Sequence, residues 1–215
     1  PALRHARWHG LGPADIVFPF FLFIMGVSAA LSISSRISKG FSGRDILKQV
    51  TRRSIILLAI GLAMSAFPFY PLERLASLRI PGVLQRIWLV YFFSSTIFLY
   101  TRGKRTAVTG LALILLHWAL LALVPVPGVG HANLTPAGNL GAWIDRSLFG
   151  SHLWRLTAVW DPEGLLGTLP AVSSAMFGMG AWKFISEKLH GRKIALMAVT
   201  GCVCVACALA WNAVF

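Results

Sequence analysis

The chain has 215 residues, of which 56% are hydrophobic, and its mean hydropathy of +0.71 excludes an ordinary soluble domain and indicates an integral membrane protein. Its formal net charge of +13 would suit nucleic-acid binding only if the basic residues shared one solvated face. They fall instead in short gaps between apolar runs, so we expect a lipid bilayer and no nucleic acid as the partner.

Six stretches carry few or no charges and are long enough to cross a hydrocarbon core of about 30 Å as helices. They cover residues 16–35, 54–72, 80–101, 106–125, 164–182 and 194–215. The segment 126–163, rich in Gly, Pro and Asn, is expected to form a loop region on the outer side. We therefore predict an all-α, polytopic transmembrane helix bundle with about six membrane helices.

The first helix is expected to begin at Pro13, because proline suits the first helical position. Asp15 would then lie in the first turn, near the positive end of the helix dipole. His5 and His9 precede this helix and offer a general base or nucleophile; the alternative is a pair of interfacial histidines beside Trp8 in an aromatic belt. Their i, i+4 spacing does not predict a metal site, since no third ligand is adjacent.

Small residues recur at spacings that let helices approach closely, beginning with Gly26 and Ala30 in the first apolar run. Gly61 with Ser65 repeats the pattern in the second run, and Gly178 belongs to a similar stripe in the fifth. We expect a tightly packed bundle.

Charged and polar groups also mark the start of the third apolar run. Arg79 and Arg86 would share a face if both were helical, and Arg86 with Gln85 offers a clamp for a phosphate or carboxylate. The alternative for Arg86 is an arginine that snorkels to the interface. His117, in the middle of the fourth run, is either functional or hydrogen-bonded within the bundle.

Two carboxylates, Asp161 and Glu163, stand directly before the fifth run, where they would bind a polar substrate or favour the start of a helix. The three cysteines, Cys202, Cys204 and Cys207, all lie in the last apolar run, where thiols behave as small hydrophobic groups. We therefore predict no metal ligands in this chain.

The distribution of basic residues predicts the orientation of the chain. Of its 20 lysines and arginines, 13 lie in the segments around 36–53, 102–105 and 183–193, which the positive-inside rule places in the cytoplasm. Five of the seven acidic residues lie on the opposite side. Polar chemistry, including that of His5, is therefore expected on the outer face.

Several strings in order, HARWHGLGPADIVFPFFLFIMG, RIPGVLQR, PVPG, AWIDRSLFG and DPEGLLGTLP, resemble the heparan-α-glucosaminide N-acetyltransferase family and its bacterial relatives. Members of that family have ten or eleven membrane helices. The resemblance therefore implies that residues 1–215 are part of one larger transmembrane acyltransferase domain. We expect it in a bacterial inner membrane, with His5 on the periplasmic face.

The resemblance also implies an activity and a set of roles. The family moves acetyl from cytoplasmic acetyl-CoA to the amine of a glucosamine-type sugar on the other side of the membrane. Its catalytic histidine lies in the string H-A-x-W-x-G, which gives that role to His5, with Asp15 as its catalytic partner. The acceptor would contact Trp8, His9, Asp161 and Glu163, and the donor would contact Arg79, Gln85 and Arg86.

Some alternatives stay open from the sequence. His5 would act as a general base in a ternary complex or would itself be acetylated. A sugar or drug transporter, or an acyltransferase acting on another periplasmic glycan, would need similar polar groups within the membrane. Assembly into a homo-oligomer is also left open.

Overall fold

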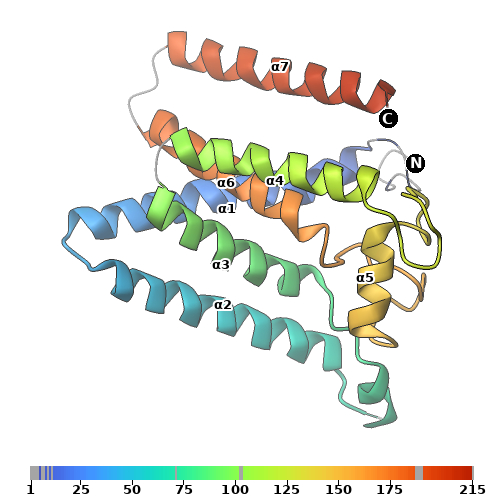
Figure 1. Cartoon of the computed structure of the whole chain (residues 1–215). Coiled ribbons are helices and arrows are strands. Elements are labelled where there is room, and N and C mark those ends of the chain that lie inside the picture. The colour runs from blue at the N-terminus through green and yellow to red at the C-terminus, as the bar shows by residue number, and fades with distance from the viewer. Residues whose placement is uncertain are drawn as a thin grey trace. The chain divides into compact units, whose positions relative to one another are not determined.

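A computed structural model describes residues 5, 8, 10, 12–70, 72–101, 104–186 and 191–214. Within these residues the regular structure is helical throughout (Figure 1). The elements are α1 (Pro13–Ser38), α2 (Gly43–Ala66), the 3₁₀ helix η1 (Leu72–Ser77), α3 (Val83–Thr101), α4 (Lys104–Leu123), α5 (Leu140–Phe149), α6 (Thr168–Ser186) and α7 (Gly191–Val214). The chain divides into two compact units, Pro1–Gly180 and Ala181–Phe215.

Four of the described helices are long and apolar enough to cross a bilayer. They are α1, α3, α4 from Arg105 and α7 as far as Trp211. The predicted all-α membrane bundle is confirmed, but four spans are found in the described part of the chain where about six were expected. Helices do form at the other two places. However, α2 contains Arg52 and Arg53, and α6 contains several polar side chains, which lowers the hydropathy of both.

Helices α1 and α6 approach each other closely enough to require glycine on both. A Cβ added to Gly26 would overlap the backbone carbonyl of Ala175, and one added to Gly178 would overlap that of Phe23. The close approach predicted from the small residues of these two runs is therefore present. A buried apolar cluster surrounds this contact and joins α1, α3 and α6: Leu22, Ile87, Val90, Ala171, Val172, Ala175 and Met176.

Helix α2 packs along α3, and it begins earlier than the sequence predicted. It starts at Gly43 rather than Ser54, because the Ser42 hydroxyl accepts a hydrogen bond from the Asp45 N–H (3.2 Å) and caps the helix. It ends at Ala66, before Phe67 and Pro68, where the residue preceding a proline takes an extended conformation.

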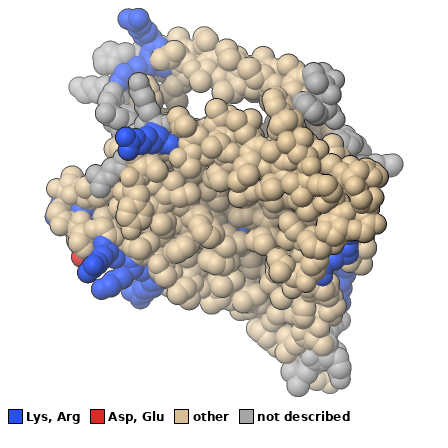
Figure 2. Space-filling view, in the orientation of Figure 1, with Lys and Arg blue, Asp and Glu red and all other residues tan. Residues whose placement is uncertain are grey.

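The early start of α2 changes the setting of several basic residues. Arg44, Lys48, Arg52 and Arg53, which the sequence placed in a gap between spans, are exposed side chains on this helix. Most of the face shown in Figure 2 carries neither acidic nor basic groups, and the basic side chains lie toward its edges. Such a distribution suits a surface in contact with lipid.

The segment 126–163 contains one short helix, α5, which the sequence analysis did not predict. Asn139 caps it by accepting a hydrogen bond from the Ala142 N–H (2.9 Å), and Gly150 ends it with a positive φ of 52°. In Figure 1, α5 runs across the ends of α3 and α4. The loop that follows α5 reaches the segment before α3, where the Ile80 N–H donates to the His152 carbonyl (3.0 Å).

Candidate active site

His5 is held by the first turn of α1. Its Nδ1 lies 2.6 Å from Oδ1 of Asp15, while Oδ2 of Asp15 accepts a hydrogen bond from the Gly12 N–H (2.8 Å). Asp15 thus both orients the imidazole and caps the helix. A carboxylate at Nδ1 favours the tautomer with the proton on that nitrogen and leaves Nε2 as a proton acceptor. The His5 side chain is 76% exposed, so a substrate can reach it.

Arg79 binds both of the carboxylates that precede α6. It donates to Asp161 through Nε (2.9 Å) and Nη2, and to Oε2 of Glu163 through Nη2 (2.5 Å). Asp161 is buried and also accepts hydrogen bonds from the backbone N–H groups of Trp154 and Glu163. Arg79 precedes α3, which begins at Val83, so it does not share a helical face with Arg86.

The charge on Arg79 is maintained by these two partners. Burial by itself lowers the pKa of Arg79. Hydrogen bonds and Coulombic attraction to Asp161 and Glu163 outweigh that loss of hydration, and the pKa is raised above its usual value. The network therefore joins the segment before α3 to the loop before α6.

Gln85 and Arg86 occupy different surroundings although they are neighbours. Gln85 is buried, and its Nε2 donates to the Ser65 hydroxyl (3.1 Å) on α2. Arg86 donates from Nη2 to the Gly164 carbonyl (2.8 Å), and its buried Nε has no hydrogen-bond partner among the described residues. A buried N–H without a partner is costly, so Arg86 is suited to an additional ligand atom.

Arg86 also lines two neighbouring cavities. The first, here called the His5 cavity, has a volume of about 640 Å³ and is lined by His5, Asp15, Arg86 and Glu163 among others. The second, the Asp145 cavity, measures about 370 Å³. Its polar and aromatic walls are Trp8, Arg86, His117, Asn139, Asp145, Trp160 and Asp161.

Asp145 was not singled out as a site residue from the sequence. It lies on α5, is 2% exposed, and accepts a hydrogen bond from the Leu165 N–H (2.9 Å). Burial raises its pKa, and hydrogen bonding to the backbone of Leu165 only partly offsets this. The feature of the sequence that points to Asp145 is the placing of an acidic residue within the amphipathic string AWIDRSLFG.

Two tryptophans, Trp8 and Trp160, form part of the wall of the Asp145 cavity. The Trp8 Nε1–H donates to the Leu134 carbonyl (3.0 Å), and the Trp8 ring lies 5.3 Å from that of Trp160 at an angle of 72°. His9 lies outside the described residues. His117, on α4, is one of the cavity's walls.

The structure brings six of the predicted site residues together around two neighbouring cavities, whereas Arg79 and Gln85 line neither cavity and His9 lies outside the described residues. His5, Asp15, Arg86 and Glu163 share the first, and Trp8 and Asp161 line the second. Among the described residues, no group of three or more His, Cys, Asp or Glu side chains is arranged to hold a metal ion.

These features define an α-helical, multi-pass membrane protein with a histidine–carboxylate pair at the start of α1. A family described as "Heparan-alpha-glucosaminide N-acetyltransferase, catalytic" matches residues 5–139. The human heparan-alpha-glucosaminide N-acetyltransferase is 31% identical over 247 residues, covering 94% of this chain and 37% of that protein. The mouse protein of the same name is 32% identical over 227 residues, covering 85% of this chain and 34% of that protein.

The chain thus belongs to the heparan-alpha-glucosaminide N-acetyltransferase family, as the resemblance in its sequence predicted. It spans about a third of the length of the curated relatives it matches.

Proposed function

We propose that this chain carries the transfer site of a transmembrane N-acetyltransferase. The enzyme would take acetyl from cytoplasmic acetyl-CoA and pass it to the amine of a glucosamine-type sugar on the opposite side of the membrane. The names of the human and mouse relatives support the reaction class and the acceptor. The single observation that carries the proposal is the 2.6 Å contact between His5 and Asp15 at the edge of a cavity shared with Arg86.

In this proposal His5 is the general base. An amino sugar is an ammonium ion at neutral pH, so it must lose a proton before nitrogen can attack a carbonyl carbon. The Nε2 of His5 takes that proton, and Asp15 stabilises the imidazolium that forms. Asp15 also fixes the direction in which Nε2 points, because it is itself held by the start of α1.

Arg86 would stabilise the negative charge that develops on the thioester oxygen. Attack by the amine forms the carbon–nitrogen bond and moves an electron pair onto this oxygen. When the oxyanion collapses, the carbon–sulfur bond breaks and the sulfur leaves as a thiolate that takes a proton from the imidazolium. The nitrogen then releases its second proton to solvent water, which leaves a neutral amide and a neutral imidazole. The Nε–H of Arg86, which has no hydrogen-bond partner in the part of the chain that the structure describes, offers a fixed donor to such an oxygen within a buried site.

The two cavities suggest where the reactants bind. The Asp145 cavity combines indole rings with a carboxylate, an amide and an imidazole, which match the apolar faces and the hydroxyl groups of a pyranose. We place the acceptor ring there and the reacting amine toward His5. Glu163, which lines the His5 cavity, remains a candidate for contact with the amine.

The contacts of Arg79, Gln85 and Asp161 suggest a different role from substrate binding. Each is engaged with protein groups: Arg79 and Asp161 with each other, and Gln85 with Ser65. We propose that these three residues position the segments around Arg86. Of the three residues predicted to contact acetyl-CoA, Arg79, Gln85 and Arg86, only Arg86 is then assigned to the donor.

The test follows thiol release from acetyl-CoA by the intact protein, supplied with glucosamine, with N-acetylglucosamine or with no acceptor. We expect release only with the free amine. Release of about one thiol per protein without acceptor would instead show that His5 is acetylated first. Arg86→Ala should lower turnover by about a hundredfold, whereas Arg105→Ala, an exposed arginine on α4, should leave it unchanged. Equal activity of these two variants would contradict the role given to Arg86.

A further inference from the structure

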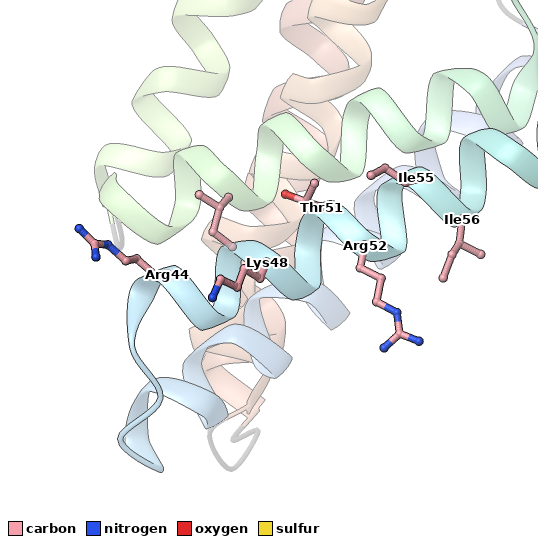
Figure 3. A pocket seen from close by; sticks show the side chains of 7 residues that line it. Arg44, Lys48, Thr51, Arg52, Ile55 and Ile56 are labelled. Carbon is pink, nitrogen blue, oxygen red and sulfur yellow. The ribbon is translucent and has the colours of Figure 1, made fainter.

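The exposed face of α2 forms a basic groove that the proposed acetyl transfer does not use. It is lined by Arg44, Leu47, Lys48, Thr51, Arg52, Ile55 and Ile56, and the three basic side chains extend outward from successive turns of the helix (Figure 3). Arg44 and Arg52 are eight residues apart, which corresponds to about 12 Å along the helix axis. We refer to these seven residues as the α2 groove.

The charges of the α2 groove are not neutralised within the described part of the chain. None of Arg44, Lys48 and Arg52 forms an ion pair with a described carboxylate. The nearest acid in sequence, Asp45, is engaged at the helix start, where it accepts a hydrogen bond from the Ser42 hydroxyl (2.6 Å). Three cations on one helical face therefore remain available to an anionic ligand.

The groove changes from charged to apolar within about one helical turn. Ile55 and Ile56 lie three and four residues after Arg52 and are 59% and 47% exposed. Ile60 and Met64 continue the exposed apolar surface along α2. A soluble phosphate would use only the cationic part of such a surface. A phospholipid would use both parts, with its headgroup at the cations and its acyl chains against the isoleucines.

We propose that the α2 groove binds an anionic phospholipid. The headgroup phosphate contacts Arg44, Lys48 and Arg52, and an acyl chain lies along Ile55 and Ile56. The positive-inside rule assigns this end of α2 to the cytoplasmic side, where anionic lipids attract basic residues at the membrane surface. The site is independent of acetyl transfer, so either proposal can fail without the other.

Native mass spectrometry of the intact protein in detergent tests this site. The protein is mixed with phosphatidylglycerol, with phosphatidylcholine of the same acyl chains, or with glycerol phosphate as the soluble headgroup. We expect retention of phosphatidylglycerol over phosphatidylcholine, and no competition from glycerol phosphate. The variant R44Q/K48Q/R52Q should lose this preference by about fivefold per residue, or roughly a hundredfold in all.

A matched control removes three exposed cations elsewhere on the same expected side, in the variant K39Q/R105Q/R192Q. It should keep the preference for phosphatidylglycerol. Equal losses in both triple variants would show a general charge effect and overturn the site, as would equal retention of the two lipids or competition by glycerol phosphate. If the α2 triple variant does not fold, two single variants replace it. K48Q should lower only the preference for phosphatidylglycerol, and I56Q should weaken the retention of both lipids. If neither single variant changes lipid retention, the site is also overturned.

Discussion

Replacing Gly164 with alanine tests how the Asp145 cavity is held together. The added Cβ would overlap the Asp145 carboxylate, which is buried on α5 and fixed by the Leu165 N–H. Gly164 does not have a positive φ, so the collision rather than backbone strain determines the cost. Overpacking in a buried site and the disturbed hydrogen bond together predict a loss of about 2–4 kcal/mol in the free energy of unfolding.

A double-mutant cycle with Asp145→Ala separates this collision from other effects. In the Asp145→Ala background the carboxylate is absent, and Gly164→Ala should cost less than about 1 kcal/mol. The free energies are measured by denaturant titration of the four proteins in detergent micelles. Gly201→Ala, where an added Cβ meets nothing within 4 Å, is the control and should not destabilise the protein. An equal cost of Gly164→Ala in both backgrounds would refute the proposed contact.

The remaining predictions concern the charged network, pH and topology. Arg79→Ala should cost about 2–4 kcal/mol of unfolding free energy, because it leaves the buried Asp161 carboxylate without its ion-pair partner. The double variant Arg79→Ala/Asp161→Asn should recover part of that cost in the same denaturant titration. Burial raises the pKa of Asp145 in the folded protein. The contribution of the protonated carboxyl group to stability is therefore complete below the unfolded pKa of about 4 and is lost as the pH rises through the raised folded pKa. The stability of the wild type relative to Asp145→Asn should fall between these two pKa values, and a difference independent of pH would contradict the raised pKa of Asp145. In a cysteine-free background, a thiol at exposed position Phe41 should react with an impermeant label only from the cytoplasmic side and one at Ala137 only from the other side, whereas reversed labelling would overturn the orientation.

The helices could be predicted because long apolar runs have few other folds available in a bilayer. The start of α1 at Pro13 also followed from local chemistry, since Gly12, Pro13 and Asp15 are common components of a helix start. The early start of α2 was missed because its first half is amphipathic and charged, which a search for uncharged runs passes over. Helix α5 was missed because it is a short amphipathic helix of ten residues within a Gly- and Pro-rich segment, which a search for long uncharged runs passes over.

Contacts within the candidate site could be predicted only where the two residues are close in sequence. His5 and Asp15 are only ten residues apart, so their contact was within reach of local reasoning. Arg79 and Asp161 are 82 residues apart, and no local pattern distinguishes an arginine that binds substrate from one that pairs with a distant carboxylate. Asp145 was missed for the same reason, because its burial depends on the packing of α5 against the turn at Gly164.

The most direct test of the proposed mechanism is chemical rescue of His5→Ala. Acetyl transfer to glucosamine is measured for the intact wild type, for His5→Ala and for His131→Ala, an exposed histidine in the loop before α5, each with and without added imidazole. The mechanism predicts that His5→Ala loses at least about a hundredfold in turnover, that imidazole restores part of it, and that His131→Ala is unaffected. Retention of more than about a tenth of the wild-type activity by His5→Ala would contradict the general-base role of His5.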